Sequence, residues 1–218
     1  IGDIGVWSFC NDKIISTGEG GMVATNNEVF FNKMIAYKNH GRIRSMPKVG
    51  NKFKWGCATF GTNLRMTEMQ AAIGIIQLRK IHVRNAVRVK YASIIYQAFE
   101  EHSEVFRLPK LPKSSNSAWY RVVVYIRPEG IKDGFSREDI IDKLNTKIIN
   151  VNSGPCPEIY LENCFQKSFF SVSERLPIAK KLGETSLSIC INSNIPIEII
   201  NRFSGTIKAV GKEIKKVV

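Results

Sequence analysis

The sequence has little of the chemistry that protein metal sites use. It contains three histidines and five cysteines in 218 residues, without a Cys-x-x-Cys pair or a histidine beside a cysteine at ligand spacing. These absences exclude the common zinc-binding patterns, and we expect no metal. An odd, scattered set of thiols indicates reduced cysteines that mostly fill a core. They are Cys10, Cys57, Cys156, Cys164 and Cys190.

Long apolar runs are also missing. The longest, such as Val122–Ile126, fall far short of the roughly 20 residues that a membrane span needs. Residues 1–6 lack the basic start and apolar stretch of a secretory signal. We therefore expect a cytoplasmic protein with no membrane segment. Because the chain opens inside a strand-like pattern without a methionine, we also expect it to be a piece of a longer polypeptide.

Acidic residues are outnumbered by basic ones, 19 against 32, which gives a formal net charge of +13. Such a charge is typical of proteins that bind nucleic acid, an anionic membrane or an anionic substrate. Lys80, Arg84 and Arg88 recur every four residues, which would place them in one basic stripe on a helix. The sequence has no helix-turn-helix, zinc-finger or RNP signature, so nucleic-acid binding is the less favoured interpretation.

In the first half of the chain, residue patterns predict two short strands followed by helices. A glycine-rich bend separates the strands, and Asn26 or Asn27 and then Thr67 can cap the helices. Residues 42–61 show no period and predict a surface loop. The expected elements are strands at 6–9 and 21–25, a helix from 27 to 41, and one long or bent helix from 67 to 101.

A proline- and serine-rich stretch from Pro109 to Ser117 is the best domain boundary. We expect one domain over residues 1–108 and a small α+β domain over residues 109–218. In the second domain, Ser136 and Asp139 have the spacing of a helix cap, and a proline opens the last helix. The expected elements are strands at 120–126, 147–151 and 186–191, and helices at 136–145 and 196–216.

Lys13 is the strongest candidate for a reactive side chain. It follows the first strand, with Ser8 five positions before it and the glycine-rich bend five positions after it. A desolvated lysine can lose its proton near neutral pH and form a Schiff base with an aldehyde. The Ser8 hydroxyl could donate a hydrogen bond to a phosphate. A lysine in such a place can equally be a solvated surface charge.

Four blocks of sequence occur in a fixed order along nearly the whole chain. They are Ser8–Gly21 (SFCNDKIISTGEGG), His40-Gly41, Gly61–Gly74 (GTNLRMTEMQAAIG), and Cys156–Glu162 with Arg175–Ala179 and Leu182–Leu187. Together these blocks resemble the DegT/DnrJ/EryC1/StrS family of sugar aminotransferases. The first block resembles the lysine segment of that family, which binds pyridoxal 5'-phosphate (PLP).

The resemblance implies an α/β fold, the C-terminal part of a fold-type-I PLP-dependent transferase. Residues 1–108 would be the end of the large PLP-binding domain with a long connecting helix, and residues 109–218 the small domain. The implied activity is PLP-dependent amino transfer to nucleotide-linked (nucleotide-diphosphate) keto sugars, with glutamate as donor, in amino-sugar biosynthesis for cell-surface polysaccharide or a similar product. Related dehydratases carry histidine in place of the lysine, so Lys13 favours transamination.

The resemblance also implies roles for single residues. Lys13 would bond to the cofactor's aldehyde and move the proton in the reaction. Ser8 would hold the cofactor phosphate, and Asn63 would reach the phosphate of the neighbouring subunit's cofactor, which implies a homodimer. Arg65 and His40 are candidates for anchoring the loop or contacting substrate.

The chain departs from the family's pattern in two places. The family's acidic partner of the pyridinium nitrogen, its ring-stacking side chain and its phosphate turn precede the lysine segment, and only seven residues precede Ser8 here. We therefore expect a truncated chain that lacks essential residues and needs an N-terminal half, which could be separately encoded. Residues 191–196 also replace a His-Pro-Thr-Leu type segment. The alternative is a catalytically silent remnant that acts as a dimerisation or anion-binding module.

Overall fold

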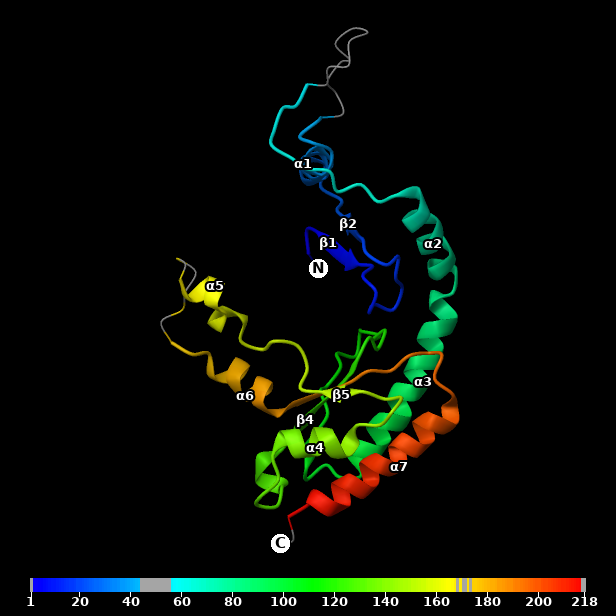
Figure 1. Cartoon of the computed structure of the whole chain (residues 1–218), viewed down its shortest axis with the longest axis vertical. Coiled ribbons are helices and arrows are strands. Elements are labelled where there is room, and N and C mark those ends of the chain that lie inside the picture. The colour runs from blue at the N-terminus through cyan, green and yellow to red at the C-terminus, as the bar shows by residue number, and fades with distance from the viewer. Residues whose placement is uncertain (1, 44–55, 168, 170–171, 173, 217–218) are drawn as a thin grey trace. The chain divides into compact units, whose positions relative to one another are not determined.

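The structure is a computed structural model (Figure 1) in which two compact units are distinguished, residues 1–81 and residues 82–218. We call the first the lysine unit and the second the sheet unit, and each is described by itself. Most of the expected loop at 42–61 falls outside the described residues. The structure describes residues 2–43, 56–167, 169, 172 and 174–216.

The lysine unit begins with an antiparallel hairpin. Strand β1 (Gly5–Ser8) pairs with β2 (Gly21–Ala24), and the register sets Ser8 opposite Gly21 at the end where the loop starts. Both expected strands are confirmed, and each ends one residue earlier than predicted. The residues between them, Phe9 to Gly20, form the lysine loop.

Two capped helices complete the lysine unit. Helix α1 (Glu28–Lys38) begins after Asn27, whose Oδ1 accepts the Phe30 N–H at 3.1 Å. Helix α2 (Glu68–Arg79) begins after Thr67, which forms a full capping box with Gln70. Both expected caps are confirmed. The sequence predicted one long helix from residue 67 onward or two with a bend, and the structure has two helices, of which α2 ends at its C-cap Lys80.

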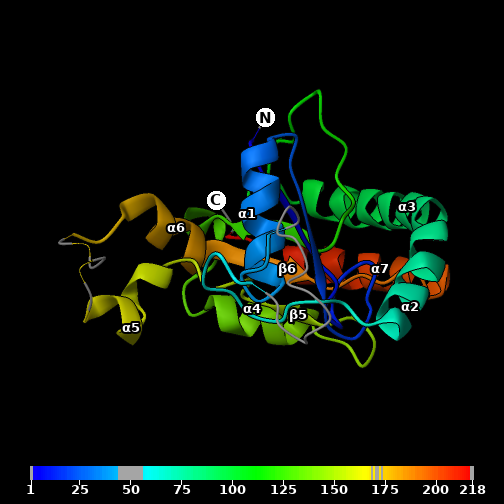
Figure 2. The same cartoon turned by 90° about the horizontal axis from the view of Figure 1, so that it is seen from above.

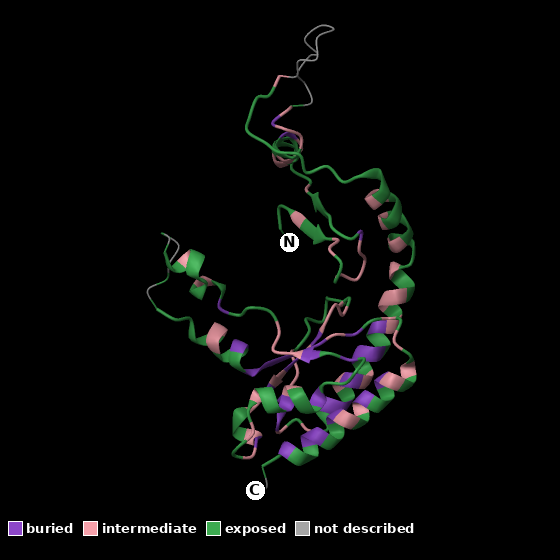
Figure 3. Ribbon diagram, in the orientation of Figure 1, coloured by how far each residue is buried: buried purple, intermediate pink, exposed green. Residues whose placement is uncertain are grey.

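The described part of the lysine unit buries very little apolar surface of its own. Ala36 is its one buried hydrophobic residue among those described, and Figure 3 shows the hairpin and α2 mostly exposed. Apolar side chains on both strands and on α2 are therefore open to solvent. They include Val6, Trp7, Met22, Val23, Met69, Ile73, Ile75, Ile76 and Leu78.

The sheet unit contains a four-stranded antiparallel sheet in the order β3-β4-β6-β5. Its central pair is β4 (Val122–Ile126) and β6 (Ser186–Ile189), with Val124 opposite Leu187. The edge strands β3 (Phe106–Arg107) and β5 (Val151–Asn152) have two residues each. The expected strands at 120–126 and 186–191 are confirmed in shortened form.

Three helices share a core with this sheet: α3 (Ile81–Glu100), α4 (Arg137–Leu144) and α7 (Ile197–Ile214). Figure 2 gives a second view of these helices. In Figure 3 the buried residues concentrate on the strands and on the helix faces that meet the sheet. The expected Ser136–Asp139 capping box of α4 is confirmed. The largest fully buried side chains are Phe99, Phe106, Phe203, Ile95, Ile140, Leu144, Ile149, Leu187, Ile189, Ile200, Ile207 and Ile214.

Arg88 does not belong to a solvated basic stripe, so that part of the nucleic-acid interpretation is wrong. The residue is 7% exposed, and its Nη1 donates to the carbonyls of Trp119 at 3.2 Å and Ile191 at 2.7 Å. Burial, with the nearby charge of Arg84, lowers the pKa of its guanidinium. Arg88 therefore ties α3 to the segments at 119 and 191 instead of facing a ligand.

Trp119, which receives one of these bonds, has a left-handed backbone with φ +51°. Its N–H donates to Ser117 Oγ at 3.1 Å, and its ring meets Tyr96 edge to face with centroids 5.0 Å apart. Such a conformation is strained for a bulky residue, so these three contacts hold the backbone in place.

The strand expected at 147–151 is mostly wrong. Thr146 Oγ1 accepts the N–H groups of Ile148 and Ile149, and Thr146 N–H donates to the Ile149 carbonyl, so the segment curls into a turn. Only β5, at 151–152, is extended there. Besides the short strand β3, the elements without a predicted counterpart are the 3-10 turns η1 (Pro128–Gly130) and η2 (Ile159–Leu161) and the helices α5 (Asn163–Gln166) and α6 (Pro177–Thr185).

The compact units divide at residues 81/82, because α3 packs its buried face in the sheet unit. The expected domain boundary at 108/109 stays a prediction. One further expectation differs from the structure. The cysteines are not core residues: Cys57, Cys156 and Cys164 are exposed, and Cys10 and Cys190 are half-buried.

Candidate active site around Lys13

The lysine loop is closed at its base by backbone hydrogen bonds. Beyond the last strand pair, Phe9 N–H donates to the Gly20 carbonyl at 2.9 Å, and Thr17 N–H donates to the Phe9 carbonyl at 3.0 Å. At the far end, Lys13 N–H donates to the Cys10 carbonyl at 3.2 Å and makes a tight turn. The hairpin therefore presents Lys13 on an ordered turn.

Lys13 and Ser8, the two residues expected at the cofactor, lie on this hairpin. Ser8 ends β1, and its Oγ accepts the Cys10 N–H at 3.3 Å. Lys13 Nζ lies 3.0 Å from Asp12 Oδ1 and 3.3 Å from Oδ2, with its side chain 32% exposed. The structure thus places an amine and a hydroxyl on one hairpin end, and it adds Asp12, which the motif did not single out.

Asn63 and Arg65 form a second cluster with Asn39, the C-cap of α1. Asn39 and Asn63 are paired by an antiparallel bridge, and Asn63 Oδ1 accepts the Arg65 N–H at 3.3 Å. Arg65 donates to Asn39 Oδ1 through Nε at 3.0 Å and through Nη2. In this structure Arg65 anchors the loop, and Asn63 is exposed.

His40 and Gly41 form the turn that ends α1. His40 has φ +60°, and its N–H donates to the Thr62 carbonyl at 3.1 Å. Gly41 has φ +76°, and a Cβ there would lie 1.7 Å from the Thr59 carbonyl oxygen, so only glycine fits. The His-Gly pair therefore has a backbone role here that brings residues 59–63 beside α1.

The lysine loop also packs against the start of α2. The Glu19 carbonyl accepts two hydrogen bonds, from Thr17 Oγ1 at 2.7 Å and from Gln70 Nε2 at 2.8 Å. Thr17 is buried, and a Cβ on Gly74 would lie 3.2 Å from its methyl group. Gln70 therefore serves two purposes, since its Oε1 also accepts the Thr67 N–H in the capping box. The sequence predicted the Thr67 cap but neither role of Gln70.

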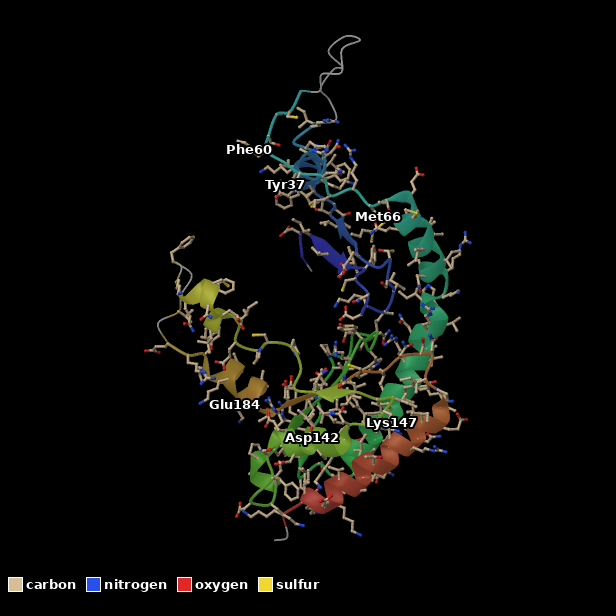
Figure 4. The ribbon with its side chains drawn as sticks, viewed as in Figure 1. Tyr37, Phe60, Met66, Asp142, Lys147 and Glu184 are labelled. Atoms are coloured by element: carbon tan, nitrogen blue, oxygen red, sulfur yellow. The ribbon has the colours of Figure 1, made fainter. Side chains whose placement is uncertain are left out.

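Beside this contact lies a groove of about 870 Å³ within the lysine unit. It is lined by β2, α1 and residues 64–70, including Tyr37 and Met66, which are labelled in Figure 4. Lys13, Ser8 and Asn63 do not line it. Its walls are mostly apolar, with Met22, Phe31, Met34 and Leu64 among them, so it suits apolar side chains better than a phosphate.

In the sheet unit, the block at 156–162 is tied to the block at 175–179 by a charged cluster. Glu158 accepts Arg175 Nε at 2.8 Å and Nη2 at 2.6 Å, and Tyr160 OH donates to the same carboxylate at 2.6 Å. The Tyr160 oxygen in turn accepts the Leu176 N–H at 2.9 Å. The hydrogen bonds from Arg175, then from Tyr160, lower the pKa of Glu158 to about 2.

Neither a metal cluster nor a membrane helix is found in the part of the chain that the structure describes. No three histidine, cysteine, aspartate or glutamate side chains gather there as ligands. No helix there is long and apolar enough to cross a bilayer.

Solved structures define the class of fold. An aminotransferase from Psychrobacter cryohalolentis is 38% identical with a TM-score of 0.89, over 98% of this chain and 57% of that one. GDP-4-keto-6-deoxy-D-mannose-3-dehydratase from Escherichia coli, solved with bound hydrated PLP, has a similar fold at 23% identity and TM-score 0.80, over 95% of this chain and 55% of that one. The fold is the C-terminal part of a fold-type-I transferase.

Residues 1–208 match the DegT/DnrJ/EryC1/StrS aminotransferase family, and the chain belongs to it. Among relatives, a GDP-perosamine synthase from Caulobacter vibrioides is 39% identical over 88 residues, which are 40% of this chain and 22% of that protein. The chain spans about half the length of the curated relatives that it matches over most of its residues.

Gln70 is expected to hold the lysine loop independently of its role as a helix cap. Gln70→Glu keeps the acceptor for Thr67 but loses the donor to the Glu19 carbonyl, while Gln70→Ala loses both. One hydrogen bond of about 1 kcal/mol predicts roughly fivefold faster amide exchange at residues 17–20 in both variants. Hydrogen exchange by mass spectrometry measures this. The Gln70→Glu variant should leave the first turn of α2 protected, and unchanged loop exchange in it would contradict the double role.

The Glu158 cluster predicts a pH dependence for the sheet unit. Because the folded pKa of Glu158 is lower than its usual value near 4.5, the charged pair stabilises the fold above pH 4.5, and that contribution is lost as the pH falls toward 2. Glu158→Gln should lower the urea midpoint at pH 7 and flatten the fall in stability between pH 5 and 3. Glu174→Gln, beside Arg175, is the control. A Glu158→Gln protein as acid-sensitive as the parent would disprove the role.

Proposed function

We propose that the chain is the C-terminal part of a PLP-dependent aminotransferase that acts on nucleotide-linked keto sugars, with glutamate as amino donor. Its family membership and the perosamine synthases among its relatives support this. The observation that carries the proposal is Lys13 on a closed hairpin loop that α2 supports. The setting would be amino-sugar biosynthesis for a cell-surface polysaccharide or a similar product.

The side chains at the hairpin end fit a phosphorylated aldehyde. Lys13 offers a primary amine that is one-third exposed, and Ser8 accepts one hydrogen bond from the backbone while its own O–H remains to donate. Asn63 has an exposed amide. In the proposed assembly Lys13 holds the cofactor by its aldehyde, Ser8 by its phosphate, and Asn63 contacts the phosphate in the neighbouring subunit.

When bound, PLP supplies an electron sink for the charge that develops at the donor's α carbon. Lys13 Nζ would be the base that takes the proton from this carbon and returns it to the C4' carbon of the cofactor. A flexible primary amine suits this exchange, and histidine occupies the position in the related dehydratases. Lys13 therefore favours transamination over removal of a hydroxyl group.

We propose that a further N-terminal part completes the site, either on the same polypeptide or separately encoded. In the family, the acidic partner of the ring nitrogen lies ahead of the lysine segment, and curated relatives are about twice as long as this chain. The apolar side chains exposed on β1, β2 and α2 support the proposal, because covering them would stabilise the assembly by the hydrophobic effect.

The net charge of +13 supports an anionic substrate. A nucleoside diphosphate carries several negative charges, and a positive protein surface raises the local concentration of such a molecule. Because Arg88 is buried and bonded to two carbonyls, the basic stripe offers less support for nucleic acid than the sequence implied.

The complete protein should form an imine with PLP that depends on Lys13. We expect added PLP to give a visible absorbance band in the parent protein, and Lys13→Ala to abolish it. Lys33→Ala, on α1, is the matched control and should keep the band. A band that survives in Lys13→Ala would contradict the assignment. No band in any form of the protein would favour the catalytically silent remnant.

If Asn63 serves the neighbouring subunit, two inactive variants should restore each other. In a mixed dimer of Lys13→Ala and Asn63→Ala subunits, one site has the native Lys13 and receives the native Asn63 from its partner. Mixing under subunit exchange should therefore give each mixed dimer up to half the activity of a parent dimer. Measured amino transfer that stays at the level of the separate variants would show that Asn63 acts within its own subunit, or that no dimer forms.

A further inference from the structure

The Asp12 side chain contacts Lys13 in the structure. Residues 10–13 form one turn, closed by the hydrogen bond from Lys13 N–H to the Cys10 carbonyl. The turn brings the Asp12 carboxylate to Lys13 Nζ, with its oxygens at 3.0 and 3.3 Å. Both oxygens thus lie within reach of one ammonium group.

A second donor holds the same carboxylate. Cys10 Sγ lies 2.8 Å from Asp12 Oδ1 and donates its S–H to it. The carboxylate is therefore fixed between a thiol and an ammonium group from the two ends of one turn. A side chain held in this way loses less freedom when it pairs with lysine than an unrestrained surface carboxylate does.

The described elements around the loop carry other charged side chains besides Asp12. The loop carries one more acid, Glu19, whose backbone carbonyl is the acceptor for Thr17 and Gln70. Helix α2, which packs on the loop, has Glu68 in its first turn and Arg79 in its last. Asp12 Oδ1 lies 3.0 Å from Lys13 Nζ and so forms an ion pair with it.

We propose that Asp12 is a positioning residue that keeps Lys13 Nζ as an ammonium group, turned onto the hairpin loop, until the cofactor displaces it. The proposal rests on the proposed function for its purpose, because an amine must give a proton to solvent before its nitrogen can attack an aldehyde. A nearby carboxylate stabilises the charged form and so opposes that loss. Asp12 would then restrain Lys13 from reacting with other aldehydes.

Acylation by acetic anhydride tests this without PLP, since only neutral amines react. The complete protein is first freed of bound aldehyde by dialysis against hydroxylamine. Lys13 labelling is then measured by peptide mass spectrometry from pH 7 to 10, with Lys33 and Lys38 as references. At pH 8 we expect Asp12→Asn to label Lys13 about threefold faster than the parent, as a screened contact of this length predicts.

Two matched variants show whether the Asp12 charge causes the effect. Asp12→Glu keeps the carboxylate, so its Lys13 should be labelled at close to the parent rate. Glu19→Gln removes the other acid of the loop and should leave the labelling rate of Lys13 unchanged. Equal rates in Asp12→Asn and the parent would overturn the inference, as would a fast rate in Asp12→Glu. Circular dichroism shows whether each variant is folded.

The same variants distinguish this inference from the proposed function. Faster labelling in Asp12→Asn with no imine band on adding PLP to either protein would mean that Asp12 controls Lys13 and that the proposed cofactor is wrong. An imine band in both proteins with equal labelling rates would keep the proposed function and remove the role of Asp12.

Discussion

The position of the lysine loop depends on one carbonyl oxygen, that of Glu19. Two donors from different segments meet on it: the Thr17 hydroxyl from within the loop and the Gln70 amide from the first turn of α2. Because Gln70 also completes the cap of α2, forming the helix and fixing the loop are linked. The residues after Asn63 lead directly into that helix, so the two predicted cofactor-binding segments are connected through it.

The two units differ in what holds them together. The sheet unit buries large side chains from α3, α4, α7 and the strands in one cluster, as expected of a part with its own core. The described lysine unit relies on hydrogen bonds, caps and tight turns, with its apolar side chains exposed. Lys13, the proposed reactive residue, thus lies in the unit that would be stabilised more if another part of the protein covered it.

Short-range sequence signals predicted many of the helices and strands, but they did not predict contacts between residues far apart in the sequence. The caps at Asn27, Thr67 and Ser136 and the proline at the start of α7 could be identified because these signals depend on neighbours in sequence. The turn at 146–149 was missed because a threonine hydroxyl captures the backbone there. Arg88 looked like one of a set of solvated charges because its carbonyl partners lie 31 and 103 residues away. The role of Lys13 stays a prediction from the motif. The partners of Asp12, Asn39 and Gln70 are identified only in the folded chain.

Trp119 shows how a strained residue affects the way sequence variation should be interpreted. Its left-handed backbone favours glycine or asparagine, while its edge-to-face contact with Tyr96 favours a large ring. A glycine there would relax the chain and give up the ring, so the two effects oppose each other. Family members that lack the tryptophan should therefore also have other residues at the positions of Ser117, Tyr96 and Arg88. The strain at Trp119 thus predicts that these four positions vary together among family members.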